Sequence, residues 1–161
     1  MRDRIPVSWH AIVVGGLIAS TADVGAASLI NWLSPVVILH AIASGVLGKA
    51  AFAGGAAAAV LGLVLQWLMG LLIAAIFVLA ASGLAWLRRR WVFAGIAYGV
   101  AIFFVMNYVV VPLSAVPFPA HHFGVRTFIE NLLAMFLFGL IIACCTRERR
   151  VPLRDAGSPA V

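Results

Sequence analysis

The chain has 161 residues, of which 65% are hydrophobic and only 10% are charged; its formal net charge is +6 and its mean hydropathy is +1.14. Soluble domains average about 45–50% apolar and about 25% charged residues, and a domain this small cannot hide so much apolar surface from water. The composition therefore excludes a soluble globular protein and a disordered one, and it indicates an integral membrane protein with several spans.

The first apolar run covers residues 7–30 and follows a charged N-terminus that contains Arg2 and Arg4. A secretory signal has an apolar region of about 7–15 residues, and this run is longer. The small residues Val24, Gly25 and Ala26 leave cleavage by a signal peptidase open as an alternative. We expect an uncleaved first span.

The next apolar stretch, from Pro35 to Gly55, is ambiguous because it contains His40, Ser44 and Lys49. It is either a fifth span or a helix on the outer side, which lies in the interface or enters the membrane part-way.

Three further runs, over residues 58–87, 91–111 and 125–145, are long enough to cross a hydrocarbon core of about 30 Å as helices. With four spans, the arginines within residues 2–4, 88–90 and 147–154 all lie on one face, and only Lys49 and Arg126 lie on the other. With five spans, the N-terminal arginines would change sides. Because basic residues concentrate on the cytoplasmic face, four spans with both termini in the cytoplasm are favoured.

We therefore predict an all-α membrane protein. Its single domain, over residues 1–146, is a four-helix transmembrane bundle with a short amphipathic or re-entrant outer helix over residues 35–50, between spans 1 and 2. Residues 147–161 are predicted to be a flexible cytoplasmic tail.

Small residues recur at helical spacing in the predicted spans, where they let helix backbones approach closely. The second span has a stripe at every fourth residue, and the third has a GxxxG motif. The positions we assign to helix packing are Gly62, Gln66, Gly70, Gly95 and Gly99. They serve either packing within one chain or a dimer face.

Ionisable and amide side chains fall at one level in three predicted spans. At 1.5 Å per residue, Asp23 and Asn107 each lie about 24 Å from the cytoplasmic end of their span. Glu130 and Asn131 lie just inside the outer end of the last span. We predict a polar pocket that opens to the outer side and is formed by Asp23, Asn107, Glu130 and Asn131, with Lys49 and His40 above it, close to His121 and His122.

The same residues could instead form structural pairs. Arg126 and Glu130 are four apart on one helix and can make a local ion pair. Asp23 could be neutralised by Lys49, or could be protonated, because burial disfavours the charged form.

Other chemistry is weakly supported. The adjacent Cys144 and Cys145 have no metal-binding spacing, and the four histidines have none either. No nucleophile, phosphate-loop or zinc-protease motif is present in the sequence. We expect no enzymatic activity, no cofactor, no metal and no nucleic acid partner.

Three stretches carry a resemblance: residues 20–23 (Ser-Thr-Ala-Asp), residues 42–55 and residues 106–114. In these the chain resembles a family of small uncharacterised bacterial inner-membrane proteins. The resemblance implies a bacterial plasma-membrane location and a four-helix topology, and it transfers no activity. A histidine is common in the second span of that family, whereas Gln66 and Trp67 stand here.

Two classes of function follow. The first is a structural or accessory membrane protein that acts through helix packing in the lipid bilayer, as a homo-oligomer or within a larger membrane complex. The second is a small-solute or proton-linked ion carrier that uses the polar pocket. The surroundings of Asp23 discriminate between them, because a carrier needs a wet cavity and a scaffold does not.

Overall fold

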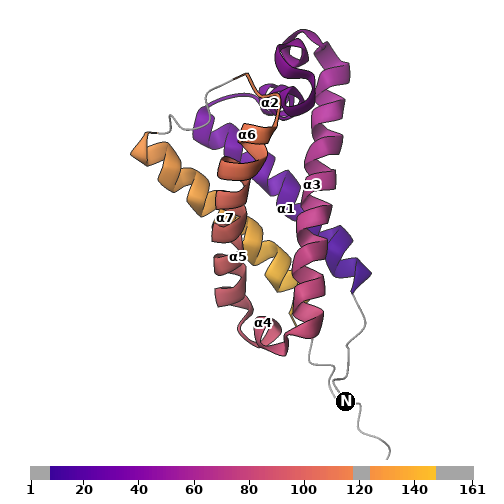
Figure 1. Ribbon diagram of the computed structural model, residues 1–161, viewed down its shortest axis with the longest axis vertical. Helices are drawn as coiled ribbons and strands as arrows, with labels where there is room; N and C mark the ends of the chain where they lie inside the picture. The colour runs from indigo at the N-terminus through magenta and orange to yellow at the C-terminus, as the bar shows by residue number, and fades with distance from the viewer. Residues whose placement is uncertain (1–7, 118–123, 148–161) are drawn as a thin grey trace, which may run out of the picture.

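The computed structural model describes residues 8–117 and 124–147, which form helices and no strand. Four long helices run alongside one another as a bundle: α1 (Trp9–Asn31), α3 (Gly55–Gly83), α5 (Trp91–Val105) and α7 (Val125–Thr146) (Figure 1). The predicted tail over residues 147–161 lies outside the described residues except for Arg147.

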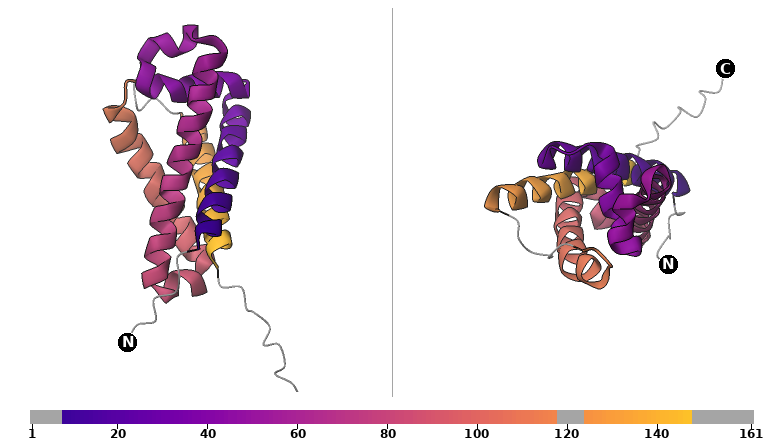
Figure 2. Two further views of the ribbon diagram at one scale, coloured as in Figure 1. Left: turned by 90° about the vertical axis from the view of Figure 1, so that its right-hand side faces the viewer. Right: turned by 90° about the horizontal axis from the view of Figure 1, so that it is seen from above.

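Short helices occupy the two ends of this bundle. At one end α2 (Pro35–Leu47) and the 3-10 helix η1 (Gly48–Ala53) connect α1 to α3, and at the other end α4 (Ala85–Arg89) connects α3 to α5 (Figures 1 and 2). The π-helix η2 (Met106–Val110) and the short α6 (Val111–Leu113) extend α5 toward the α2 end.

Five helical segments are long and apolar enough to cross a membrane, one more than the sequence analysis counted. The additional segment is Pro35–Ala53, which combines α2 and η1. With 13 residues, α2 is about 20 Å long, which is short of a hydrocarbon core of about 30 Å. It lies across one end of the bundle and does not run along it (Figure 2).

Local signals explain several helix ends. The side chain of Ser34 caps α2 by accepting a hydrogen bond from the Val37 amide, and Pro35 follows at the first helical position. Gly48 ends α2 with a φ of 58°, in the left-handed region that favours glycine.

The second predicted span, 58–87, is displaced from the observed α3, which begins at Gly55 and ends at Gly83. Leu84 takes an extended conformation with φ −122° and ψ 90°, so the chain breaks there and restarts as α4. The third predicted span ends at Val111, but its helix continues through Pro112 to Leu113. A proline has no N–H to donate, and a π-turn precedes it, in which the Val111 amide donates to the Met106 carbonyl.

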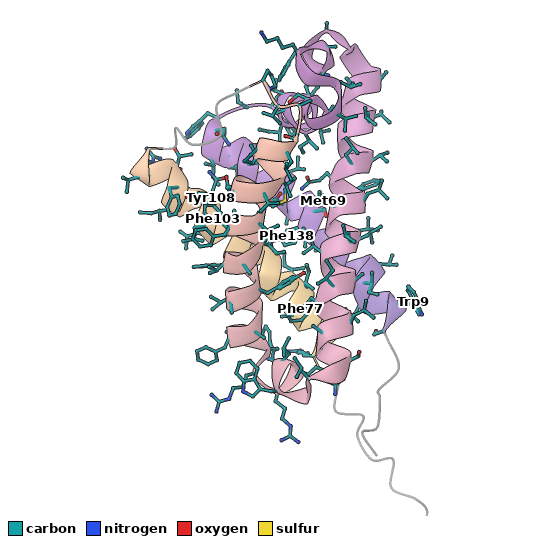
Figure 3. All side chains as sticks on the ribbon, viewed as in Figure 1. Trp9, Met69, Phe77, Phe103, Tyr108 and Phe138 are labelled. Atoms are coloured by element: carbon teal, nitrogen blue, oxygen red, sulfur yellow. The ribbon has the colours of Figure 1, made fainter. Side chains whose placement is uncertain are left out.

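The bundle is held by three well-packed helix pairs in a row. Helix α7 packs against both α5 and α1, and α1 packs against α3, whereas the backbones of α3 and α5 lie farther apart and meet through side chains. The core between these helices contains Phe77, Phe138 and Ile142 (Figure 3 labels the first two). The bundle is therefore closed along three sides and loosely joined along the fourth.

The outward faces remain apolar, as expected of helices that contact lipid. On α3 alone Leu68, Leu72, Ile76 and Leu79 are each more than half exposed. At the α4 end, the exposed Trp86 and the basic Arg89 and Arg90 lie together in the chain, and the Arg147 guanidinium stacks 5.6 Å from the Trp91 ring centre. Aromatic and basic residues of this kind are typical of a membrane interface.

Candidate functional site

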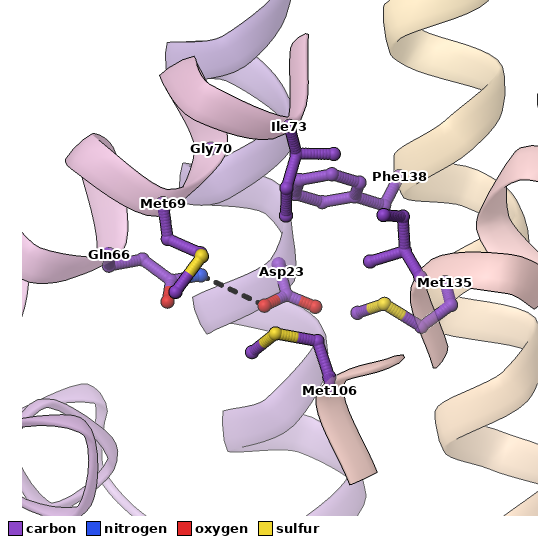
Figure 4. Close-up of a pocket in the computed structure, with 9 residues that line it drawn as sticks. Asp23, Gln66, Met69, Gly70, Ile73, Met106, Met135 and Phe138 are labelled. Carbon is purple, nitrogen blue, oxygen red and sulfur yellow. Dashed lines mark hydrogen bonds between the residues drawn. The ribbon is translucent and has the colours of Figure 1, made fainter. Parts of the chain in front are cut away.

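The Asp23 carboxylate lies inside the bundle and has a partner on a second helix. The Gln66 side-chain amide, on α3, donates to Asp23 Oδ2 over 2.9 Å and to the Ser20 carbonyl over 3.3 Å (Figure 4). Gln66 was predicted to serve helix packing, and in the structure it is the hydrogen-bond partner of the acidic residue. This contact joins α1 to α3 through polar atoms.

Close backbone contact between α1 and α3 brings these two side chains together. A Cβ atom on Gly70 would collide with Ser20 Oγ, and one on Gly16 would stand 3.0 Å from the Gly70 carbonyl oxygen. The buried Ser20 hydroxyl is itself satisfied, since it donates to the Gly16 carbonyl over 2.7 Å. The small residues of both helices thus set the level at which Asp23 faces Gln66.

A cavity of about 30 Å³ adjoins the Asp23 carboxylate. A water molecule needs at least about 10–15 Å³ of such space, so there is room for about two. Its walls come from α1, α3, α5, η2 and α7, and the lining residues are Asp23, Gln66, Met69, Gly70, Ile73, Ile102, Met106, Met135 and Phe138. Asp23 and Gln66 supply the polar side chains of this lining, and the remainder is apolar or thioether.

Next to the cavity, α3 and α5 are connected by one aromatic side chain. The Tyr98 hydroxyl donates to the Ile73 carbonyl over 2.7 Å, and the Tyr98 and Phe77 rings lie 5.0 Å apart between centres. Ile73 also lines the cavity. Tyr98 therefore bridges the loosely joined side of the bundle at Ile73, a residue that lines the cavity.

The other predicted pocket residues of the third and fourth spans are engaged locally. The Asn107 amide donates to the Phe103 carbonyl, the Asn131 amide donates to the Thr127 carbonyl, and both distances are 2.8 Å. Glu130 accepts a hydrogen bond from Arg126 Nε over 2.8 Å, in the ion pair that the sequence offered as the structural alternative. None of these three side chains lines the cavity around Asp23.

His40 and Lys49, the two predicted residues of the outer segment, lie at the α2 end of the bundle. His40 Nε2 is hydrogen-bonded to the Gly55 carbonyl over 2.8 Å, which ties α2 to the start of α3. Lys49 is exposed on η1, and the Asp23 carboxylate accepts its hydrogen bond from Gln66. His121 and His122 lie outside the described residues.

The methionines of the cavity were not predicted from the sequence. Met69, Met106 and Met135 all line the cavity, and they are three of the four methionines in the chain. One methionine in each of three spans was visible in the sequence, but a helix position facing the interior could not be told from one facing lipid in a span that is apolar all round. The sequence predicted that Asn107 lies beside Asp23, and in the structure its neighbour Met106 lines that cavity.

The site thus combines one carboxylate, one amide and three thioethers. Among the described residues no group of three or more His, Cys, Asp or Glu side chains is placed to hold a metal ion.

Together, the fold and its apolar helices define a polytopic membrane protein in contact with the lipid bilayer. No protein-family model, curated protein or solved structure matches this chain, so the resemblance to a bacterial inner-membrane family stays a prediction.

Proposed function

We propose that this protein is an accessory membrane protein of the bacterial plasma membrane, which acts through its helix faces within a larger assembly and catalyses no reaction. The observation that carries the proposal is that Gln66 is the polar neighbour of Asp23 in the cavity lining and the rest of that lining is apolar or thioether. The Asp23 carboxylate is bonded to Gln66 and lies beside methionine, isoleucine and phenylalanine side chains. The carboxylate of Glu130 is paired with Arg126 on α7 and does not line this cavity.

The proposal includes four spans with both termini in the cytoplasm. The short α2 at the end of the bundle supports it, as does the gathering of Arg88, Arg89 and Arg90 with Arg147 at the opposite end. In this arrangement α2 and η1 cover the outer ends of the spans.

Labelling of single cysteines tests this topology, in a chain whose Cys144 and Cys145 are replaced by serine. Asn31→Cys and Lys49→Cys both place a thiol at exposed positions, one on each side of α2. A membrane-impermeant thiol reagent, added outside right-side-out vesicles, should label both if Pro35–Ala53 does not cross the membrane. Labelling of Lys49→Cys with protection of Asn31→Cys, which then reacts only after the membrane is opened, would show a fifth span and overturn the four-span proposal.

The accessory role is tested by the size of the particle in the native membrane. Chemical crosslinking in intact membranes should shift the 17.0 kDa chain into a larger species, as a homo-oligomer or a hetero-complex. A chain that stays monomeric under conditions that crosslink a known membrane dimer contradicts an accessory role.

A second candidate, a small-ion carrier, has one observation in its favour. The cavity places a carboxylate in a space lined by five helical segments, and intramembrane carboxylates often mark ion pathways. An Asp23→Cys variant in the same cysteine-free background distinguishes the two. Protection from the impermeant reagent favours the accessory protein, and labelling from the outer side favours the carrier.

A further inference from the structure

Three methionine side chains line the cavity beside Asp23. Met69 comes from α3, Met106 from the start of the π-helix, and Met135 from α7, while Asp23 comes from α1. Figure 4 shows the three methionine side chains around the carboxylate, with the Met135 side chain extended toward it and the end of Met69 beside Gln66. Four separate helical segments thus contribute one ligand-type group each to one small space.

We propose that this cavity is a binding site for a single soft monovalent metal cation, Cu(I), held by the three thioethers of Met69, Met106 and Met135 and by the Asp23 carboxylate. The proposal goes beyond the accessory role and holds whether or not the ion is moved across the membrane. Thioether sulfur is a soft ligand that selects Cu(I) over the hard cations, which prefer oxygen.

Charge balance favours a monovalent ion. The thioethers are neutral, so Asp23 supplies the single negative charge of the site. A monovalent cation on one carboxylate leaves no net charge inside the bundle, whereas a divalent cation would leave one positive charge uncompensated at a high desolvation cost.

The second observation is the conformation of the backbone at Met106. This residue begins the π-helix Met106–Val110, and π-turns within helices frequently occur at functional sites. The extra residue in the turn changes the direction of the side chains around it. Here Met106 faces the cavity and its neighbour Asn107 bonds back to its own helix.

Gln66 acts as a positioning residue. Its amide donates to Asp23 Oδ2, and the other carboxylate oxygen points toward Met135 in Figure 4. A hydrogen bond of this kind orients a ligating carboxylate, and loss of such a partner typically weakens metal binding by about 10–100-fold.

One wall of the cavity, between α3 and α5, is loosely joined. Helices α3 and α5 meet through side chains, and in the side view of Figure 2 the α5–α6 segment leans away from α3 toward the α2 end. The unbranched methionine side chains have three rotatable bonds, so they can rearrange around an incoming ion.

The test measures Cu(I) bound to the purified full-length chain under reducing conditions, in competition with a Cu(I)-selective chelator. Because thiols bind the same metal, the background carries Cys144→Ser and Cys145→Ser. We expect one equivalent of Cu(I) per chain, and the redox-inert Ag(I) should displace it. X-ray absorption at the copper edge should show about three sulfur neighbours, which a bound ion held by histidines would not show.

Substitutions of each methionine by leucine remove one sulfur at nearly constant volume. Each should weaken binding by at least about tenfold, the effect of losing even an outer-shell partner, and the triple substitution should abolish it. Asp23→Asn and Gln66→Leu should also weaken it. The matched control is Leu72→Met, which adds a thioether on an exposed face of α3 and should leave affinity and stoichiometry unchanged.

Two results overturn the proposal. One is the absence of competitive Cu(I) binding in the thiol-free chain; the other is a bound equivalent with unchanged affinity in the triple Met→Leu variant. Each variant is first checked for a single species on gel filtration and a cooperative unfolding transition. If the triple variant does not fold, the three single variants decide by the same comparison. Neither result bears on crosslinking in membranes, so the accessory role stands or fails separately.

Discussion

Two interfaces of the same helix, α5, are built in opposite ways. Toward α7 the backbones touch: a Cβ atom on Gly99 would collide with the Met135 carbonyl oxygen, and one on Gly95 would stand 2.9 Å from the Gly139 carbonyl oxygen. Toward α3 the backbones lie farther apart, and a tyrosine hydrogen bond and a small cavity occupy the space. In lipid, where apolar burial gives little driving force between helices, small residues allow the first kind of contact.

The difference explains where the adaptable part of the bundle lies. At the glycine contacts between α5 and α7 the two backbones touch directly, so no side chain there can move to make room. The α3–α5 side is filled by methionine and tyrosine side chains, which can move without moving a helix. A ligand site within this fold is therefore expected on the loosely joined side, beside Asp23.

The largest expected effect comes from adding a methyl group at the tightly packed interface between α5 and α7. Gly99→Ala should push α5 and α7 apart, since the added carbon would lie 2.9 Å from the Met135 carbonyl carbon and 3.2 Å from Phe136 Cα. The free energy of unfolding should fall by about 1–3 kcal/mol, the usual cost of overpacking. Thermal unfolding in detergent, followed by tryptophan fluorescence, measures this.

Gly25→Ala is the matched control for that substitution. Gly25 also lies inside a long helix, but a Cβ atom there has no neighbour within 4 Å. Its unfolding temperature should stay the same or rise, because alanine restricts the unfolded chain more than glycine does. Equal losses in both variants would show that the α5–α7 contact does not limit stability.

A smaller effect is expected on the loose side. Tyr98→Phe keeps the ring that contacts Phe77 and removes the hydroxyl that donates to the Ile73 carbonyl. Hydrogen bonds between membrane helices average about 0.6 kcal/mol and reach about 1.7 kcal/mol, so the loss should be in that range. Tyr98→Leu should cost more, since the ring contact goes too. A Tyr98→Phe loss as large as that of Gly99→Ala would remove the distinction between the two interfaces.

The smallest effect should come from an ion pair that joins no two helices. Arg126→Gln breaks the contact with Glu130 four residues along α7, where the arginine side chain is 81% exposed. Exposed pairs of this kind contribute little because water competes and ordering two long side chains costs entropy. The unfolding temperature and the Cu(I) affinity should both stay unchanged. A lower Cu(I) affinity in this variant would mean that Glu130 acts on the cavity.

Particular residues show how far sequence reasoning reached into the site. Gly70 and Gly99 were assigned to helix packing from their spacing, and both lie at helix crossings. Asp23 was identified as the unusual residue of the first span, because a carboxylate is costly in an apolar segment. Polarity also selects Asn107 and Asn131 as its neighbours; in the structure their amides bond within their own helices, and methionines line the cavity beside Asp23.

The sequence by itself determined the class of protein, the helical architecture and the approximate position of each long helix. Long apolar runs in lipid must satisfy their backbone hydrogen bonds internally, which leaves helices as the solution. Tertiary structure alone decided which faces meet: the pairing of Gln66 with Asp23, and the turning of Met106 into the cavity. The physical reason is that the spacing of small residues marks a packing face but not the helix that it meets, and that a π-turn leaves no periodic pattern in a span that is apolar all round.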